Sequence, residues 1–401
     1  MRPLRVLCLT TGTENEPSAR FRVHQLLPEL AERGIAVTAL PLVGDRTLEI
    51  EYGVRSVPTP VRAGLAAARL PVRVSRRALS LARAHRWDAL WIQKEVLPFG
   101  LWRALDRIRV PVVYDFDDAI YAKRDRGGAL RRVSESMMRR ERALPAQLAR
   151  CDRVVAGNAV LASYARQHSA AVEIIPSVVS ARALSKPLDR RNDPPLIGWY
   201  GAPSGAPYLA AIRGALQRLA EEERFVLCVM GLRHFECPGV EVRCEPFRRL
   251  DAEEEWRMLS SCDVGVMPLP ETVWAEGKCA LKAIQYMACG LPVVASPVGA
   301  AREVLDHGRA GLLAADENAW WNQLRRLLRD RELAHRLAIA GRKRVLAHYS
   351  VPVAASRWAA IFRELCASRW ATRHAAPRSR TASAAAAALS SAASPSSDRA
   401  S

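Results

Sequence analysis

Residues 274–299 read WAEGKCALKAIQYMACGLPVVASPVG, and this stretch decides the fold class of the chain. A loop of small and charged residues leads into a helix that is expected to begin at about Cys279 and to carry its apolar residues on one face. Gly290 caps this helix, and Pro292 prevents its continuation. Residues 293–295 then form a short apolar run, so the stretch is a helix followed directly by a strand, as in α/β domains.

Lys278 and Lys282 stand four residues apart where this helix is expected to start. Side chains at that spacing project from the same side of a helix. Free backbone N–H groups at a helix start, assisted by two ammonium groups, form a favourable diphosphate site. The alternative interpretation is a surface loop with two solvated lysines.

Short apolar runs recur on both sides of this stretch, separated by amphipathic segments. The alternation predicts βαβ units with buried parallel strands. In the first half, a helix is expected over residues 22–33, ending at Gly34. The expected strands lie at residues 4–9, 35–40, 88–93, 110–115, 153–156, 196–201, 225–230, 264–269 and 292–295.

The chain has 401 residues, enough for about two domains. Residues 187–195 (PLDRRNDPP) have no periodicity and contain three prolines, so they are interpreted as an interdomain linker. An N-terminal Rossmann-like domain is expected over residues 1–186 and a second over residues 196–350. A C-terminal helix over residues 351–371 could cross back to the N-terminal domain. The remaining segment, residues 372–401, is rich in Ala, Ser and Arg and is expected to be a disordered tail.

The segment from Met287 to Ser296 (MACGLPVVAS) resembles the donor-site motif of the family-four retaining glycosyltransferases, the group 1 type with the GT-B fold. The resemblance extends over residues 1–366 and is strongest over residues 196–315. It implies an α/β fold of two Rossmann-like, doubly wound domains that face each other across a cleft. The residues expected to bind a nucleotide-sugar donor are Gly201, Ser204, Glu276, Gly277, Cys279, Gln285 and Met267, of which Met267 also suits a core position.

Two positions depart from the pattern of that family, in which two glutamates separated by seven residues flank the start of this helix. Gln285 stands where the second glutamate usually holds the ribose hydroxyls, and Gly277 stands at the position of the first. Gln285 can still donate and accept hydrogen bonds, but it has no charge. Lys278 and Lys282 are expected to replace the basic residues that the family often places in the first loop of the donor domain.

Charged residues that follow strands of the N-terminal half are candidates for the acceptor side. Arg20 and Arg22 follow the first strand, where open α/β sheets bind ligands. They are expected to contact an anionic acceptor, and ordinary helix-start charges are the alternative. A segment like PSARFR (residues 17–22) is familiar in a subgroup of the family.

Three carboxylates, at residues 115, 117 and 118, follow another apolar run. Asp117 and Asp118 are the candidate catalytic carboxylates beside Lys278 and Lys282, with a helix-capping role as the alternative. Lys94 and Glu95 follow a third strand and are further candidates for acceptor binding. No metal ligands are assigned, because GT-B transferases generally work without a catalytic metal. The nucleotide sugar is expected as a co-substrate rather than a bound cofactor.

The formal net charge of the chain is +19. Residues 341–401 contain ten Lys or Arg and two Asp or Glu, which gives +8 for this segment alone. The charge favours binding to an anionic membrane surface or to a lipid-linked acceptor. The alternative explanation is a proteome-wide bias toward arginine. Nucleic acid is excluded because the sequence contains no nucleic-acid-binding motif. Nine unpatterned cysteines and the lack of a long apolar run favour a cytoplasmic protein, with peripheral contact at the inner face of the membrane as an option.

The sequence therefore predicts a retaining, hexosyltransferase-like glycosyltransferase. The acceptor is a hydroxyl of a glycan, a lipid-linked sugar or a small molecule, consistent with polysaccharide biosynthesis at the cell envelope. A catalytically inactive nucleotide-sugar-binding partner, which Gln285 keeps open, and a sugar-nucleotide epimerase of the same fold are the alternatives.

Overall fold

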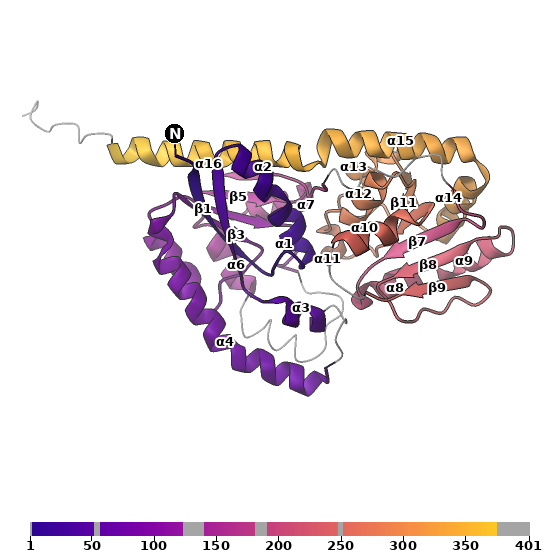
Figure 1. The fold of residues 1–401 in the computed structure, drawn as a ribbon, viewed down its shortest axis with the longest axis horizontal. Coiled ribbons are helices and arrows are strands. Elements are labelled where there is room, and N and C mark those ends of the chain that lie inside the picture. The colour runs from indigo at the N-terminus through magenta and orange to yellow at the C-terminus, as the bar shows by residue number, and fades with distance from the viewer. Residues whose placement is uncertain (1, 52–56, 123–139, 181–190, 248–251, 375–401) are drawn as a thin grey trace, which may run out of the picture.

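The computed structural model describes residues 2–51, 57–122, 140–180, 191–247 and 252–374. Two six-stranded sheets, parallel throughout, lie side by side in the molecule (Figure 1). The chain forms the first sheet before residue 175 and the second after residue 195. The predicted pair of doubly wound α/β sheets is therefore confirmed.

The first sheet has the strand order β2-β1-β3-β4-β5-β6, and the chain reverses direction across the sheet between β1 and β3. Apolar side chains of the strands fill a core on each face. The strands are β1 (Leu4–Thr10), β2 (Ile35–Pro41), β3 (Ala89–Gln93), β4 (Val112–Phe116), β5 (Arg153–Ala156) and β6 (Val172–Ile174). The helices of this half are α1 (Pro17–Arg22), α2 (Leu27–Glu32), α3 (Asp45–Glu51), α4 (Thr59–Ala82), α6 (Arg140–Leu148) and α7 (Ala159–Arg166).

The second sheet has the order β12-β11-β10-β7-β8-β9 and reverses between β7 and β10. Its strands are β7 (Leu196–Tyr200), β8 (Val226–Met230), β9 (Glu241–Glu245), β10 (Val264–Met267), β11 (Val293–Ala295) and β12 (Leu312–Leu313). Its helices are α8 (Ala206–Ala210), α9 (Arg213–Ala220), α10 (Ala252–Ser260), α11 (Val273–Glu276), α12 (Leu281–Ala288), α13 (Ala301–Val304), α14 (Glu317–Arg329) and α15 (Arg331–His348).

The last helix, α16 (Val351–His374), returns to the first sheet and lies along the upper edge of that half (Figure 1). Trp358 and Phe362 of this helix pack on Trp91 of β3, with ring centroids 4.2 and 5.7 Å from the Trp91 ring. All three side chains are fully buried, so the end of the described chain completes the core of its first sheet. Residues 375–401, most of the predicted tail, lie outside the described residues.

The deciding stretch forms the predicted helix and strand, but the helix starts two residues later than expected. Ala280, at a φ of 52°, is the N-cap of α12, so Lys278 belongs to the preceding loop and Lys282 to the first turn. Gly290, at a φ of 72°, ends α12 as predicted, because this left-handed conformation favours glycine.

One predicted helix is wrong in its extent. Residues 22–33 do not form one helix, because the backbone leaves the helical region at Val23, between α1 and α2. In the described part of the chain, no helix combines the length and the apolarity needed to cross a membrane.

Candidate functional site

Two lysines from the second half of the chain lie where its α12 meets the first half. Lys278 donates a hydrogen bond to Asp118, with 2.7 Å between Nζ and Oδ1, and its ammonium group lies 4.9 Å from the ring centroid of Trp274. Lys282, one helical turn later in sequence, has its ammonium group 5.6 Å from the ring centroid of Tyr200. The sequence-predicted pair therefore lies at the boundary between the two halves.

Asp118 lies between two ammonium groups, since Lys94 also donates a hydrogen bond to it. Lys94 is 3.1 Å from Asp117 Oδ1 as well. Burial would raise the pKa of Asp118, but Lys278 and Lys94 outweigh burial and hold this pKa well below its usual value. Asp118 is thus an ionised carboxylate. Through Lys94 it is connected to the end of β3, and through Lys278 to the loop before α12.

Lys282 forms no ion pair with any described residue. Burial and the charge of Lys278 lower its pKa to about 8, although the charges of Glu255 and Asp118 act in the opposite direction. Removing part of an ammonium group from water next to a second positive charge costs free energy unless an anion compensates the charge. The pair can therefore bind an anion such as a diphosphate.

Asp117 accepts a hydrogen bond from a network of two buried polar side chains. Ser18 Oγ donates to Asp117 Oδ2 at 2.7 Å, and Gln93 Nε2 donates to Ser18 Oγ at 2.8 Å. Gln93 and Ser18 are both buried. No helix begins at Asp117 or Asp118 within residues 117–122, so the described chain gives neither carboxylate the helix-capping role. Gln93 ends β3, and its place before Lys94 and Glu95 at a strand end is a signal that the sequence offered. Ser18 lies in α1, and nothing in the sequence singled it out as a site residue.

A second charged contact crosses the boundary at Arg20. Its guanidinium donates to Glu255 of α10, and the amide of Gln285 donates to the other oxygen of the same carboxylate. All three side chains are buried. Glu255 thus supplies a negative charge next to Gln285, the position where the family usually carries a glutamate. Nothing in the local sequence of α10 points to this role.

The loop before α12 packs directly on the first half. Asn158 Nδ2 donates to the backbone oxygens of Gly277 and Lys278 at 3.1 and 3.2 Å. Cys279 Sγ donates to Asp117 O at 3.1 Å. A Cβ added to Gly277 would lie 2.4 Å from Ala119 Cβ, so this close approach requires glycine.

Two family models match the chain, one in each half. Residues 20–183 match the model described as Glycosyltransferase Family 4, and residues 208–330 match Glycosyl transferases group 1. The chain carries two glycosyltransferase domains. No curated protein matches the chain.

Solved structures of the GT-B fold cover nearly the whole transferase. Sucrose-phosphate synthase from Thermosynechococcus elongatus is 16% identical, with a TM-score of 0.62 over 91% of this chain and 100% of that chain. A glycosyltransferase from Rickettsia africae is 13% identical, with a TM-score of 0.58 over 91% and 99%. Anabaena HepE in complex with UDP-glucose is 14% identical, with a TM-score of 0.58 over 90% and 100%. These similarities show the GT-B fold.

Two predicted acceptor residues of the transferase lie in buried ion pairs. Arg22 is paired with Asp115 and donates to Ile175 O at 2.6 Å. Glu95 is paired with Arg77, with 2.8 Å between Oε2 and Nε. These pairs fix α1 and α4 to the first sheet, whereas Lys94 contacts the site carboxylates.

The remaining predicted donor residues lie around the second sheet. Glu276 Oε2 accepts a hydrogen bond from Gly299 N at 3.0 Å, which links the end of α11 to the segment after β11. Met267 is buried in the core at the end of β10. Gly201 and Ser204 belong to the loop after β7, where the Gly201 backbone lies against the ring of Trp199.

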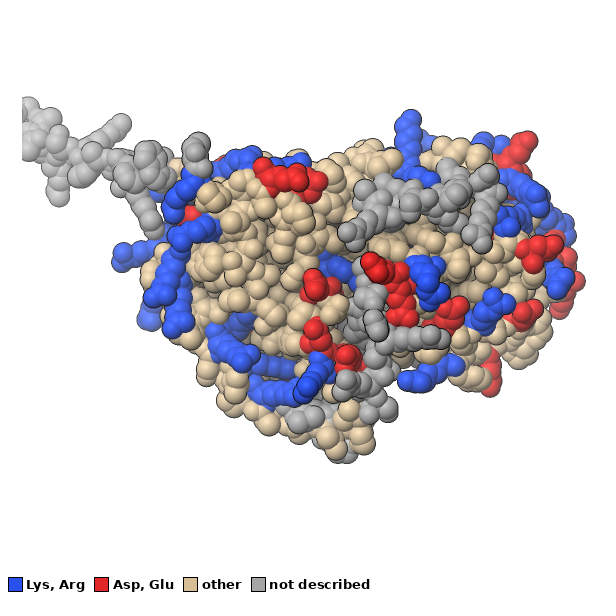
Figure 2. Space-filling view, in the orientation of Figure 1, with Lys and Arg blue, Asp and Glu red and all other residues tan. Residues whose placement is uncertain are grey.

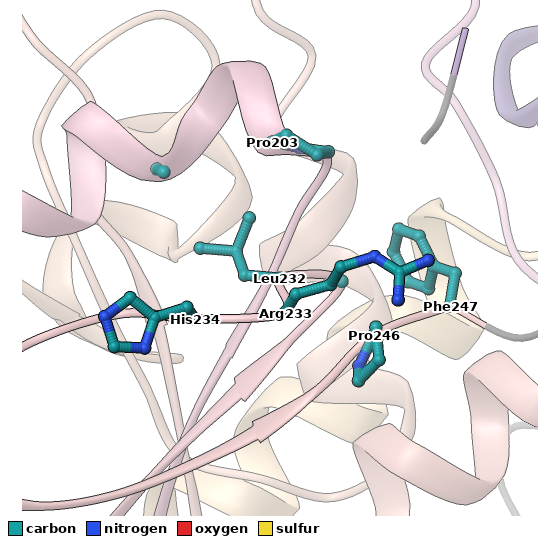
Figure 3. A pocket seen from close by; sticks show the side chains of 8 residues that line it. Pro203, Leu232, Arg233, His234, Pro246 and Phe247 are labelled. Atoms are coloured by element: carbon teal, nitrogen blue, oxygen red, sulfur yellow. The ribbon is translucent and has the colours of Figure 1, made fainter. Parts of the chain in front are cut away.

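A pocket of about 400 Å³ opens beside that loop of the transferase (Figure 3). It lies at the carboxyl ends of β7, β8 and β9, where ligands bind in open α/β sheets. The Arg233 side chain extends toward Phe247 in this pocket (Figure 3). The sequence did not predict the pocket, whose lining residues are Pro203, Ala206, Gly231, Leu232, Arg233, His234, Pro246 and Phe247.

Proposed function

We propose that the protein transfers a sugar from a nucleotide-diphosphate sugar to an acceptor hydroxyl, with retention of the anomeric configuration. The observation that carries this proposal is Lys282, a half-buried ammonium group with no described ion-pair partner, beside Lys278 at the boundary between the two domains. The donor diphosphate is the anion proposed for this pair. UDP is the first nucleotide to test, because Anabaena HepE binds UDP-glucose.

The two lysines would act on the leaving group. Negative charge grows on the diphosphate as its bond to the sugar breaks, and fixed ammonium groups stabilise that charge more in the transition state than in the ground state. Lys282 would bind the diphosphate directly. Lys278 would divide its hydrogen bonds between Asp118 and the phosphate, because it already contacts Asp118.

Asp118 is a poor general base at neutral pH, because its pKa lies well below the usual value. We therefore propose that a phosphate oxygen of the leaving group takes the proton of the acceptor hydroxyl. Asp118 would keep Lys94 and Lys278 in place, and Asp117, held by Ser18, would orient the acceptor. We also propose that the lysines supply the positive charge for this step without a divalent cation.

The acceptor is proposed to be a hydroxyl of a glycan or a lipid-linked sugar of the cell envelope. The +19 charge of the chain favours such anionic partners. Gln285, next to Glu255, is the proposed contact for the donor ribose.

A thermal-shift panel of UDP-, GDP-, ADP- and TDP-sugars tests donor binding first. The stabilising donor is then incubated with the protein and an envelope-lipid extract, in the presence and absence of a chelator, and nucleotide release and lipid glycosylation are measured. Equal transfer with the chelator is expected. Isomerised donor would identify an epimerase, binding without turnover an inactive partner, and no stabilisation by any donor would refute the proposal.

Lys282→Ala is expected to lower the rate of transfer at least tenfold with an unchanged melting temperature. Arg336→Ala is the matched control, since its side chain is 64% exposed on α15 and lies outside the site. Wild-type turnover in Lys282→Ala would end the diphosphate assignment.

A further inference from the structure

The C-terminal part of helix α4 is held on the first domain by a buried arginine, Arg77, and by Leu81, which packs in the core. Arg77 is paired with Glu95, and it donates hydrogen bonds to Leu40 O at 3.0 Å and to Thr10 O at 2.8 Å. Only 3% of Arg77 is exposed. Since Arg77 points into the domain, the opposite side of α4 must face outward.

That outward side of α4 carries large apolar side chains. Val61, Val72 and Leu79 are 52%, 54% and 49% exposed. At 3.6 residues per turn these three fall on one line, roughly 160° around the helix from Arg77. A surface helix normally turns its apolar stripe toward the core, so an exposed stripe on one line indicates a binding face.

The charged residues of the segment that forms α4 itself have one sign. Residues 52–87 contain eight arginines and no Asp or Glu. Arg69, Arg76 and Arg83 are exposed and follow each other at intervals of seven residues, so they flank the apolar line on the same side. Figure 2 shows Lys and Arg side chains along the lower left of the molecule, where α4 runs in Figure 1.

We propose that this face of α4, defined by Val61, Val72, Leu79 and the three arginines, lies on an anionic lipid surface. An interfacial helix places apolar side chains at the boundary of headgroups and acyl chains, and its arginines pair with lipid phosphates. Nucleic acid offers phosphates to the arginines but leaves the apolar line unexplained. Contact with lipid through α4 goes beyond the transfer reaction and does not depend on it.

The position of α4 relates this surface to the candidate site. Arg77, the buried anchor of the helix, pairs with Glu95, and the adjacent Lys94 contacts Asp117 and Asp118. A membrane that binds α4 therefore contacts the same domain that would bind the acceptor. A lipid-linked acceptor would reach the site from that membrane.

Helix α15 is the natural comparison, because it also exposes apolar and basic residues. Ile339 and Leu346 are 45% and 50% exposed, and Lys343 is exposed. Unlike α4, this helix carries an acidic residue, Glu332, which lies 3.7 Å from Arg336. Helix α15 lies along the upper edge of the molecule and α4 along the lower edge (Figure 1), so the two helices present separate surfaces that can be tested independently.

Vesicle sedimentation of the full chain tests the proposal. The protein is expected to bind phosphatidylcholine vesicles that contain about one third phosphatidylglycerol, and to bind pure phosphatidylcholine at least tenfold more weakly. Arg76→Glu with Arg83→Glu should weaken binding to the anionic vesicles at least tenfold. Arg336→Glu with Lys343→Glu, which changes the net charge equally on α15, should stay within about twofold of wild type.

Val72→Ser with Leu79→Ser separates insertion from simple charge attraction, because it should weaken vesicle binding even at low salt. Melting temperature and nucleotide-induced thermal shift should match wild type in all three double variants, which separates this test from the test of transfer. The proposal is overturned if wild type does not sediment, if the α4 variants bind like wild type, or if the α15 variant loses binding. Loss of duplex-DNA binding in the arginine variant with unchanged vesicle binding would assign the face to nucleic acid instead.

Discussion

The pH dependence of nucleotide binding gives the sharpest test of Lys282. Its pKa is lowered to about 8 by burial and by the charge of Lys278, so the ammonium form predominates at pH 7 and is lost as the pH rises through 8. If the diphosphate binds only the ammonium form, the apparent Kd rises by a factor of 1 plus the ratio of neutral to charged lysine. Between pH 7 and pH 9 this is about a tenfold loss of affinity.

The measurement is titration calorimetry of the stabilising nucleotide sugar between pH 6.5 and 9.5, with Lys282→Arg as the comparison. Arginine keeps its charge over this range, so the variant should bind with the same affinity at pH 7 and pH 9, even if that affinity is lower than in wild type. Wild-type affinity that does not change between pH 7 and pH 9 would refute the assignment of the diphosphate to Lys282. An equal decline in Lys282→Arg would assign the titration to another group.

Three further substitutions test contacts of the candidate site. Gly277→Ala should lower turnover more than tenfold while nucleotide affinity stays within about twofold, because its Cβ would meet Ala119 of the other domain at 2.4 Å; unchanged turnover would exclude a need for this contact. Gln285→Glu should lower the melting temperature, because a second buried carboxylate would face Glu255. Adding Glu255→Gln to the same chain should restore the melting temperature. If the melting-temperature changes of the two substitutions simply add, the two residues are not coupled. Asp118→Asn should lower the free energy of unfolding in urea by about 3 kcal/mol at pH 7. Because the carboxylate pKa is depressed in the fold, this difference should begin to shrink only below about pH 4, where an unfolded aspartate becomes protonated, and should keep shrinking at more acidic pH as the folded carboxylate takes up its proton. A difference that is the same at about pH 2 and pH 7 would contradict the ion-pair role.

The sequence predicted the strands and helix ends that depend on a few neighbouring residues, because such local patterns can be recognised without knowing the tertiary contacts. The apolar runs became buried strands, and Gly290 ended α12 by its left-handed conformation. Weak patterns were missed: β9 contains Glu241, Arg243 and Glu245 in five residues, and β6 has three residues, none fully buried. These strands lie at sheet edges, where apolar residues on both faces are not required.

The candidate site was predictable only in part, because its charges are paired over long sequence separations. Lys278 and Asp118 were each proposed from their positions after a loop or a strand, but their hydrogen bond joins residues from different domains. Arg20 was expected to face an acceptor, and the structure pairs it with Glu255, 235 residues away in the chain. No pattern within one helix or strand encodes such a partner.

The return of α16 to the first sheet bears on how the protein folds during synthesis. Trp91 is made early, but the rings that bury it, those of Trp358 and Phe362, emerge from the ribosome only after the whole second domain. Val23, Leu26 and Leu30 cover part of the same face, but the part beneath α16 stays uncovered until then, which makes the nascent chain a client for chaperones that bind apolar surfaces. A chain that ends before residue 351 would have a first domain without the helix that packs on its sheet. Loss of α16 should therefore lead to aggregation rather than to a separately folded half.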